Sequence, residues 1–244
     1  MDINEAFKKT TKFIFGKELE GDLDDYNEWL SKRIPKPIEK KSILSNKKVF
    51  VIEDVYPIVS NDEIVIGASV VDGNFDNTES LNDIINKIKP IINYTGNRNI
   101  YNSSNIYKSD LCLSSRNVYN SILIQNSEYI SNCFDVNLSH MVFGSKLGRY
   151  ISSSINIYSG VKVTNCLDVN FCSDTSNCLF CCKGSNLDNC MFCFNTNAKK
   201  YSVGNLDVGR KKFFELKKIV VGGLIQELEK SKSLKMNIFN ILEI

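Results

Sequence analysis

A twelve-residue repeat runs through the centre of the chain and restricts its fold more than any other feature. Dividing the sequence at Ser104 and after every twelfth residue gives eight units that end at Lys199. The third position of these units carries Ile106, Val118, Ile130, Val142, Ser154, Cys166, Cys178 and Cys190. Asparagine recurs at the second position, as Asn105, Asn117, Asn165, Asn177 and Asn189. Small or β-branched residues in fixed columns, with few charges, predict a parallel β-solenoid whose like side chains stack from coil to coil.

The size of one coil depends on the fourth position of the repeat, which carries larger residues. Twelve residues close only a narrow two-sided tube with room for Ser, Cys and Val. A coil of twenty-four residues has room for Phe143, Leu167 and Met191, and we therefore favour it. The two halves of many units are also similar to each other, so that apolar residues such as Ile106 and Cys112 recur every six residues. This leaves open a hexapeptide helix with eighteen-residue coils.

The segments on either side of the repeat differ from it in composition and divide the chain into three parts. Residues 1–98 predict an α+β domain with helices over 3–15, 21–34 and 80–90 and strands over 47–55 and 63–71. Residues 99–199 form the solenoid, and residues 200–244 form a cap and a helical C-terminal tail. The expected fold is mainly β, a parallel β-solenoid with an N-terminal α+β domain and a C-terminal helix.

The charge balance of the chain favours no particular partner. Thirty basic residues against 28 acidic ones give a net charge of +2, which indicates neither nucleic acid nor a membrane as a partner. The N-terminal residues lack the basic and then apolar layout of a signal peptide. We expect a cytoplasmic or virion location, other protein subunits as partners, and no small-molecule substrate.

Two Cys-x-x-Cys pairs near the end of the repeat, Cys178 with Cys181 and Cys190 with Cys193, resemble a zinc ligand set. All four fall in the third and sixth columns, where earlier units have Ile106 with Ser109. Since cysteine packs as a small apolar residue, we favour inward packing and expect no metal or cofactor, with zinc or disulfide chemistry as alternatives. Cys182 lies outside these columns and is the thiol that we expect to be most exposed.

The sequence contains no recognisable catalytic constellation. His140 is the single histidine, and hexapeptide-helix acyltransferases use a histidine as general base, so an acyltransferase using His140 is an alternative. Its column is otherwise polar, and no insertion nearby could build an acyl-donor pocket. Asp168 and Asp174 lie six residues apart, but no second catalytic group accompanies them. We therefore expect that the protein is not an enzyme and assign no catalytic residue.

The last units, NCLFCCKGSNLDNCMFCFN followed by KKYSVGN, resemble a group of cysteine- and asparagine-rich β-solenoid proteins of large phages and uncultivated bacteria. The resemblance covers about residues 99–205, and the chain departs from it in having few cysteines before Cys166. That group has no established activity. The resemblance implies a rigid structural module, and with it a non-enzymatic structural or interaction protein of a larger assembly such as a phage virion.

Overall fold

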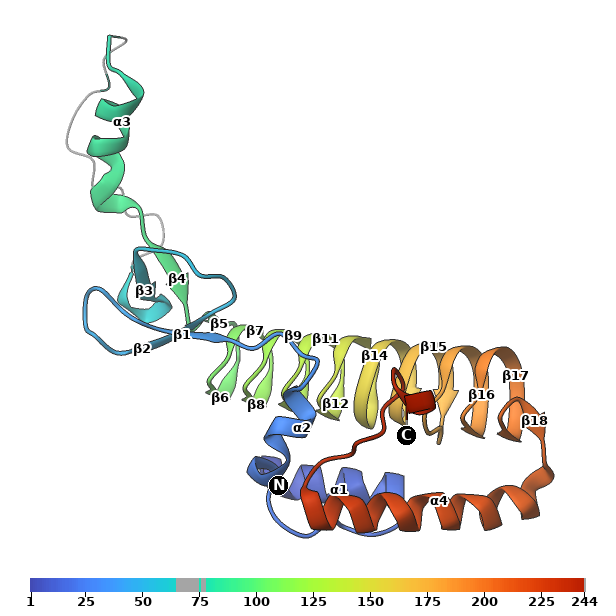
Figure 1. Cartoon of the computed structure of the whole chain (residues 1–244). Coiled ribbons are helices and arrows are strands. Elements are labelled where there is room, and N and C mark those ends of the chain that lie inside the picture. Colours follow the sequence, from blue (N-terminus) through green and yellow to red (C-terminus); the bar gives the residue numbers. More distant parts are fainter. Residues whose placement is uncertain (65–74, 76–77, 244) are drawn as a thin grey trace.

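The protein is mainly β, and its centre is a parallel β-solenoid of about nine turns (Figure 1). The computed structural model describes residues 1–64, 75 and 78–243. Helices α1 and α4 run alongside the solenoid, and a small β unit with a projecting helix, α3, lies at its N-terminal end. The expected fold class is therefore confirmed, including the N-terminal and C-terminal helices.

The elements follow one another in three groups. The helices are α1 (Ile3–Phe15), α2 (Asn27–Ser31), α3 (Leu81–Ile88) and α4 (Gly209–Ser231), with 3₁₀ turns η1 (Leu23–Tyr26), η2 (Asn61–Glu63), η3 (Lys89–Ile91) and η4 (Ile241–Glu243). The N-terminal β unit comprises β1 (Ile38–Lys41), β2 (Lys48–Val51), β3 (Ile58–Ser60) and β4 (Tyr94–Gly96). The solenoid strands are β5 (Asn99–Ile100), β6 (Ser104–Tyr107), β7 (Asp110–Leu113), β8 (Arg116–Tyr119), β9 (Ile122–Gln125), β10 (Glu128–Ser131), β11 (Phe134–Asn137), β12 (His140–Phe143), β13 (Lys146–Arg149), β14 (Ser152–Thr164), β15 (Leu167–Ser176), β16 (Cys182–Met191), β17 (Phe194–Val203) and β18 (Leu206–Asp207).

Each coil of the solenoid contains twelve residues. Parallel strands pair each residue with the one twelve positions later, as Val118 pairs with Ile130 and Ile130 with Val142. Coils of twenty-four residues, which the sequence favoured, and the eighteen-residue alternative are both wrong. The bulky fourth column misled that estimate, because Phe143 and its neighbours in the column point out of the tube.

The coil is built from triplets, a finer period within the twelve-residue repeat. From Asn105 to Tyr201 every third residue has a left-handed backbone, with φ between 46° and 69°. The next residue in each triplet points inward, and every third residue from Ser109 to Cys193 is buried. Asparagine tolerates left-handed φ better than most residues do, which explains why it recurs at these corners. Its amides also bond between coils, since Asn105 Nδ2 donates to Asn117 Oδ1 at 3.0 Å.

Serine and cysteine inside the tube join one coil to the next. The Ser121 hydroxyl donates to the carbonyl of Tyr119 at 2.8 Å and accepts the backbone N–H of Cys133 at 3.0 Å. Cys133 repeats the pattern, and its sulfur accepts from the N–H of Ser145 at 3.4 Å. A thiol can thus replace a hydroxyl in this position, and both satisfy buried backbone groups that would otherwise be costly.

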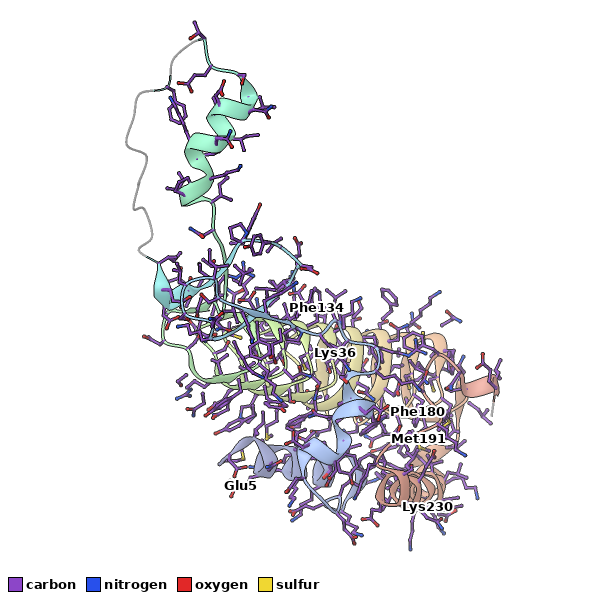
Figure 2. The ribbon with its side chains drawn as sticks, turned by 60° about the vertical axis from the view of Figure 1, so that its left-hand side comes forward. Glu5, Lys36, Phe134, Phe180, Met191 and Lys230 are labelled. Carbon is purple, nitrogen blue, oxygen red and sulfur yellow. The ribbon has the colours of Figure 1, made fainter. Side chains whose placement is uncertain are left out.

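From Phe143 onward the fourth column forms an outer face that the helices cover, whereas Tyr107 at the start of the column is exposed. Its buried apolar members are Phe143, Ile155, Leu167, Leu179 and Met191. Phe143 packs edge-on against Phe7 of α1 with ring centroids 5.2 Å apart. Figure 2 places Phe180 and Met191 on the helix side of the solenoid and Phe134 on the other side. The solenoid therefore takes part in two cores, a narrow one inside the tube and a wide one between the outer face and the helices. A third, small cluster of Val49, Val51 and Ile58 lies in the N-terminal β unit.

Most of the expected segments outside the repeat are present. Helices α1, α3 and α4 lie where the sequence placed them, and α3 gives way at Lys89 to a 3₁₀ turn that contains Pro90. The expected helix over 21–34 is shorter, because η1 precedes the five-residue α2. The expected strand over 63–71 falls mostly outside the described residues. None of the described helices is long and apolar enough to cross a membrane.

Candidate functional site at the open end of the solenoid

The two ends of the solenoid are finished differently. At the C-terminal end β18 pairs antiparallel with β17, and the Asn205 side chain bonds to both the N–H and the carbonyl of Phe194. At the N-terminal end β6 pairs with β8 alone, and no other described strand pairs with its second edge. An unpaired strand edge presents backbone donors and acceptors to whatever lies beside it.

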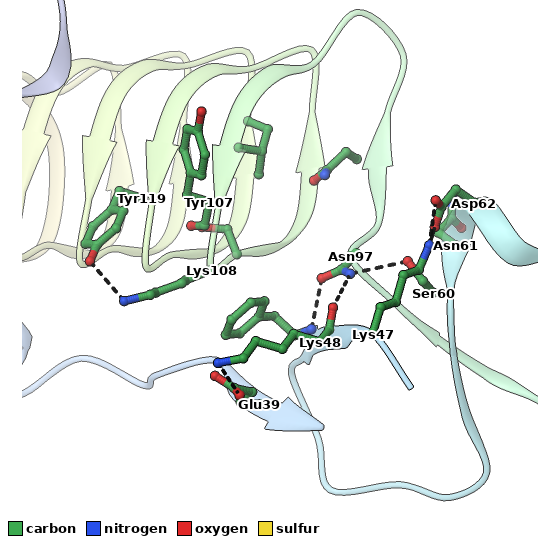
Figure 3. Close-up of a pocket in the computed structure, with 14 residues that line it drawn as sticks. Glu39, Lys47, Lys48, Ser60, Asn61, Asp62, Asn97, Tyr107, Lys108 and Tyr119 are labelled. Atoms are coloured by element: carbon green, nitrogen blue, oxygen red, sulfur yellow. Dashed lines mark hydrogen bonds and ion pairs between the residues drawn. The ribbon is translucent and has the colours of Figure 1, made fainter. Parts of the chain in front are cut away.

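A cleft of about 660 Å³ borders this end of the solenoid, and we call it the edge cleft. Its solenoid wall comes from the segment Ile106–Ser109 with Tyr119. The N-terminal β unit supplies the facing wall, through β1, β2 and the turn after β3, as Figure 3 shows for Glu39, Lys48 and Asp62. The remaining lining residues are Lys47, Phe50, Ser60, Asn61, Asn97 and Asn99.

The two walls are fixed to each other by residues 97 and 98. The Asn97 side chain accepts the N–H of Phe50 at 2.9 Å and donates to the carbonyl of Lys48 at 3.1 Å. The Arg98 guanidinium forms an ion pair with Asp110, which is fully buried in the first coil. Hydrogen bonding to Asp110 raises the pKa of Arg98, so the guanidinium stays charged. The shape of the cleft is thus set by a rigid junction.

Most charges of the edge cleft are already paired within the N-terminal β unit. Lys47 lies 2.7 Å from Asp62, and Lys48 lies 2.9 Å from Glu39. Lys108 differs, because it donates a hydrogen bond to the Tyr119 hydroxyl at 3.3 Å and lies 5.4 Å from the centre of that ring. Among the described residues Lys108 therefore has no carboxylate partner. The cleft can accept an anionic group at this point.

The edge cleft offers the groups of a binding surface rather than those of a reaction centre. Its lining contains no histidine and no cysteine. The Ser109 hydroxyl already donates to the Tyr107 carbonyl at 2.7 Å and accepts the N–H of Ser121 at 3.0 Å, so it is engaged in the coil. What remains is a strand edge, two tyrosines and a lysine. These groups suit a ligand with its own backbone, since a strand edge is read by hydrogen bonds.

The four cysteines of the zinc-like motif lie inside the tube. Cys178, Cys181, Cys190 and Cys193 are buried, and all nine cysteines are free thiols. The Cys178 thiol lies 3.1 Å from the Ser176 carbonyl and accepts the N–H of Cys190 at 3.3 Å. Burial raises the pKa of Cys178, which disfavours the thiolate that a metal requires. Within the described residues no group of three or more His, Cys, Asp or Glu side chains could hold a metal ion.

The other residues singled out in the sequence lie apart from the edge cleft. His140 is half-buried on β12, with its ring edge-on to Tyr129 at 5.5 Å, and does not line the cleft. Cys182 is the only cysteine that is not buried, which agrees with the expectation for it. Asp168 and Asp174 occupy different corners of the coil, one buried and the other exposed, so they do not act as a pair.

Asp168 is a buried carboxylate to which the sequence assigned no role. One oxygen accepts the N–H of Ile238 at 3.0 Å, and this contact holds the C-terminal tail against the solenoid. The other oxygen is buried and has no hydrogen-bond partner among the residues that the structure describes. Burial raises the pKa of Asp168 to about 7, although Arg33 acts in the opposite direction. The sequence feature that could have indicated this burial is the position of Asp168 in the fifth column, which lies on the helix-covered side of the solenoid at this coil.

The edge cleft was not anticipated from the sequence either, because its walls come from segments far apart in the chain. Lys47 and Lys108 lie in different parts of the sequence, and no local motif connects them. Comparison with known proteins adds no name to the site. No protein-family model, no curated protein and no solved structure matches this chain.

Proposed function

We propose that the protein is a non-enzymatic structural subunit that acts by binding other protein chains in a larger assembly. The observation that carries this proposal is the difference between the two ends of the solenoid, one closed by β18 and the other left with an unpaired β6 edge beside a cleft. Natural sheet proteins usually cover or block such edges, so an accessible one indicates a place for a partner.

The filled interior of the solenoid supports a structural role. Gly148 faces inward, and an added Cβ would lie 2.3 Å from Ile151 Cδ1, so neighbouring columns already fill the tube to capacity. The coils are joined by hydrogen bonds through their inward serines and cysteines. A rod of this kind holds its two ends at a fixed separation, which is what a spacer in an assembly requires.

The kind of assembly is suggested by the resemblance of residues 99–205 to β-solenoid proteins of large phages. That resemblance supports a virion as the assembly, with the solenoid as a rigid module within it. His140 and the four cysteines contribute to this role by packing, since His140 lies against Tyr129 and the thiols bond to backbone groups.

The proposal is tested by the size of the complex that contains this chain in its native source. We expect the chain, which has a mass of 27.6 kDa, to co-migrate with other subunits at fixed stoichiometry in sedimentation of gently prepared extracts or particles. Chemical cross-linking should place those subunits near the N-terminal end of the solenoid. A chain that sediments as a free monomer and gives no cross-linked partner would reject the proposal.

A further inference from the structure

The free edge of β6 has the backbone geometry that the other strands on this side use for pairing, and it is available to a ligand. Each strand on this side pairs with the strand twelve residues later, and β6 is the first of the series. On the other side of the same coil β5 already pairs with β7, so half of an additional coil is present. We propose that the edge cleft binds an extended peptide segment of a partner protein, which adds to β6 and carries a carboxylate opposite Lys108. The inference rests on the proposed function and names the ligand of its binding site.

The inner core at this end has an incomplete cover, which favours an apolar residue in the peptide. Ile106 is the first member of the third column and is only partly buried. Val118 and Ile130, its successors in the column, are fully buried. A strand added to β6 would place one inward side chain over Ile106, as Ile106 itself lies over Val118. A small or β-branched residue fits there, since the column contains only such residues.

The charges of the cleft favour an acidic residue two positions later. The fifth column of a strand stacked on β6 would lie over Lys108, which lacks a carboxylate partner among the described residues. The lining contains Lys47, Lys48 and Lys108 against Glu39 and Asp62, and the last two are already paired. A carboxylate at this position would be attracted, and a lysine would be repelled.

The facing wall explains why a single peptide is a better ligand than a second copy of the solenoid. Lys48 and Asp62 stand opposite the β6 edge (Figure 3), and Phe50 also lines the cleft, so the edge borders a cleft instead of an open surface. The last coil of a second copy could not pair with it in the same register, because β18 pairs with Ser202 and Val203 of β17 and the Asn205 side chain bonds to Phe194 there. A peptide can add to the unpaired edge of β6 without displacing β18 from β17.

A blocked synthetic hexapeptide, SNVYDS, is a direct probe of this proposal. It follows the column pattern of the coils, with Val for the position over Ile106 and Asp for the position over Lys108. We expect its titration into the ¹⁵N-labelled full chain to shift amide signals of residues 104–109 and of β2. The matched peptide SNVYKS should bind at least fivefold more weakly, and a version with N-methylated backbone amides should not bind.

A charge reversal in the protein provides the second half of the test. Lys108→Glu should weaken SNVYDS at least fivefold and strengthen SNVYKS. Lys183→Glu is the matched control, because Lys183 is also exposed and has a left-handed backbone, and it should leave both affinities unchanged. If Lys108→Glu does not fold, the comparison of the three peptides on the unaltered chain decides the question alone.

Four outcomes would overturn the inference: no binding of SNVYDS, equal binding of both peptides, signal shifts that avoid residues 104–109, or light scattering that shows a dimer formed through this edge. These results are distinguishable from failure of the proposed function. If the Lys108→Glu chain remains in its native complex and no peptide binds to the unaltered chain, the structural role stands and the peptide site is rejected. If the chain binds SNVYDS but sediments as a free monomer from its native source, the peptide site stands and the structural role is rejected.

Discussion

The inner and outer faces of the same strands are packed by opposite rules. Inside the tube, Ser, Cys, Val and Ile fill a space that twelve residues enclose, and the polar ones bond from coil to coil. Outside, the fourth-column residues from Phe143 to Met191 meet the helices in a core with aromatic pairs. The inner face therefore sets the diameter of the solenoid, whereas the outer face supplies most of the large apolar contacts. Variants on each face should separate these two contributions.

The largest expected effect is on the outer face. Phe143→Ala should lower the free energy of unfolding by about 3–5 kcal/mol, because a fully buried ring in contact with Phe7 is lost and a cavity remains. Urea unfolding followed by circular dichroism measures the change. Phe171→Ala is the control, since Phe171 is 61% exposed, and it should change the free energy by less than about 0.5 kcal/mol. Equal effects of the two variants would contradict the importance of the helix-covered core.

The second effect depends on pH and also belongs to the outer face. The folded-state pKa of Asp168, about 7, is above its ordinary value of 3.8, so the folded state holds the proton more tightly. Protonated Asp168 therefore gives its full contribution to the stability of the fold below about pH 4. This contribution is lost as the pH rises through 7. The shift corresponds to at most about 4 kcal/mol.

Asp168→Asn should flatten this dependence between pH 5 and pH 8, measured as the urea midpoint at each pH. Cys133 of the inner face should not titrate over this range, because burial raises its pKa to about 12. A wild-type and a variant chain with the same pH profile would exclude Asp168 as its source.

The contact between α2 and the solenoid gives a smaller effect. A Cβ at Gly144 would lie 2.3 Å from Asn156 Oδ1 and 2.8 Å from the Leu30 carbonyl. Gly144→Ala should therefore destabilise the fold by about 2–3 kcal/mol through strain and overpacking. Gly204→Ala is a matched control with the same left-handed backbone and no atom within 4 Å, and it should cost about 1 kcal/mol. Thermal unfolding of both variants measures the difference, and equal losses would rule out the contact.

The inner face should distinguish hydrogen bonding from size. Cys178→Ser should change the free energy of unfolding by less than about 1 kcal/mol, because Ser occupies the same role in earlier coils. Cys178→Ala should cost about 1–3 kcal/mol, since it leaves the buried N–H of Cys190 without its acceptor. Chemical denaturation of the pair measures both. If Ser costs as much as Ala, the thiol acts through its volume alone.

The smallest effect concerns reactivity and leaves stability unchanged. Cys182 is the one cysteine that is not buried, so a thiol reagent should label one site rapidly in the folded chain and nine sites after denaturation. Cys182→Ser should remove the rapid phase. Rapid labelling of two or more thiols would show that the tube interior is more open than its hydrogen bonds indicate.

The repeat allowed the solenoid to be predicted, but its coil size could not be derived from composition. Columns of Ile, Val and Ser predict stacking, and the pairing of residues twelve apart confirms it. The fourth column contains Phe143 and Met191, and nothing local distinguishes an outward residue beneath a helix from an inward one in a wider tube. The position of α1 decides between them, and a long-range contact of this kind does not appear in a repeat pattern.

The edge cleft was beyond prediction for a related reason. It exists because no described strand pairs with the second edge of β6 and because Asn97 and Arg98 fix the N-terminal β unit beside that edge. The four cysteines of the Cys-x-x-Cys pairs, by contrast, could be placed from the sequence, because they share columns with Ile106 and Ser109. Their agreement with inward packing follows from the regular triplet, whereas the cleft follows from the interruption of that regularity.

The triplet backbone restricts which changes in length the gene can tolerate. A deletion of three residues keeps every inward position inward, because the next triplet has the same conformation. It also rotates the rest of the rod by one side, which carries Phe143 and its column away from α1. Only a change of twelve residues preserves both cores. We expect related chains to differ in length by whole coils, and rods of different reach to share the same ends.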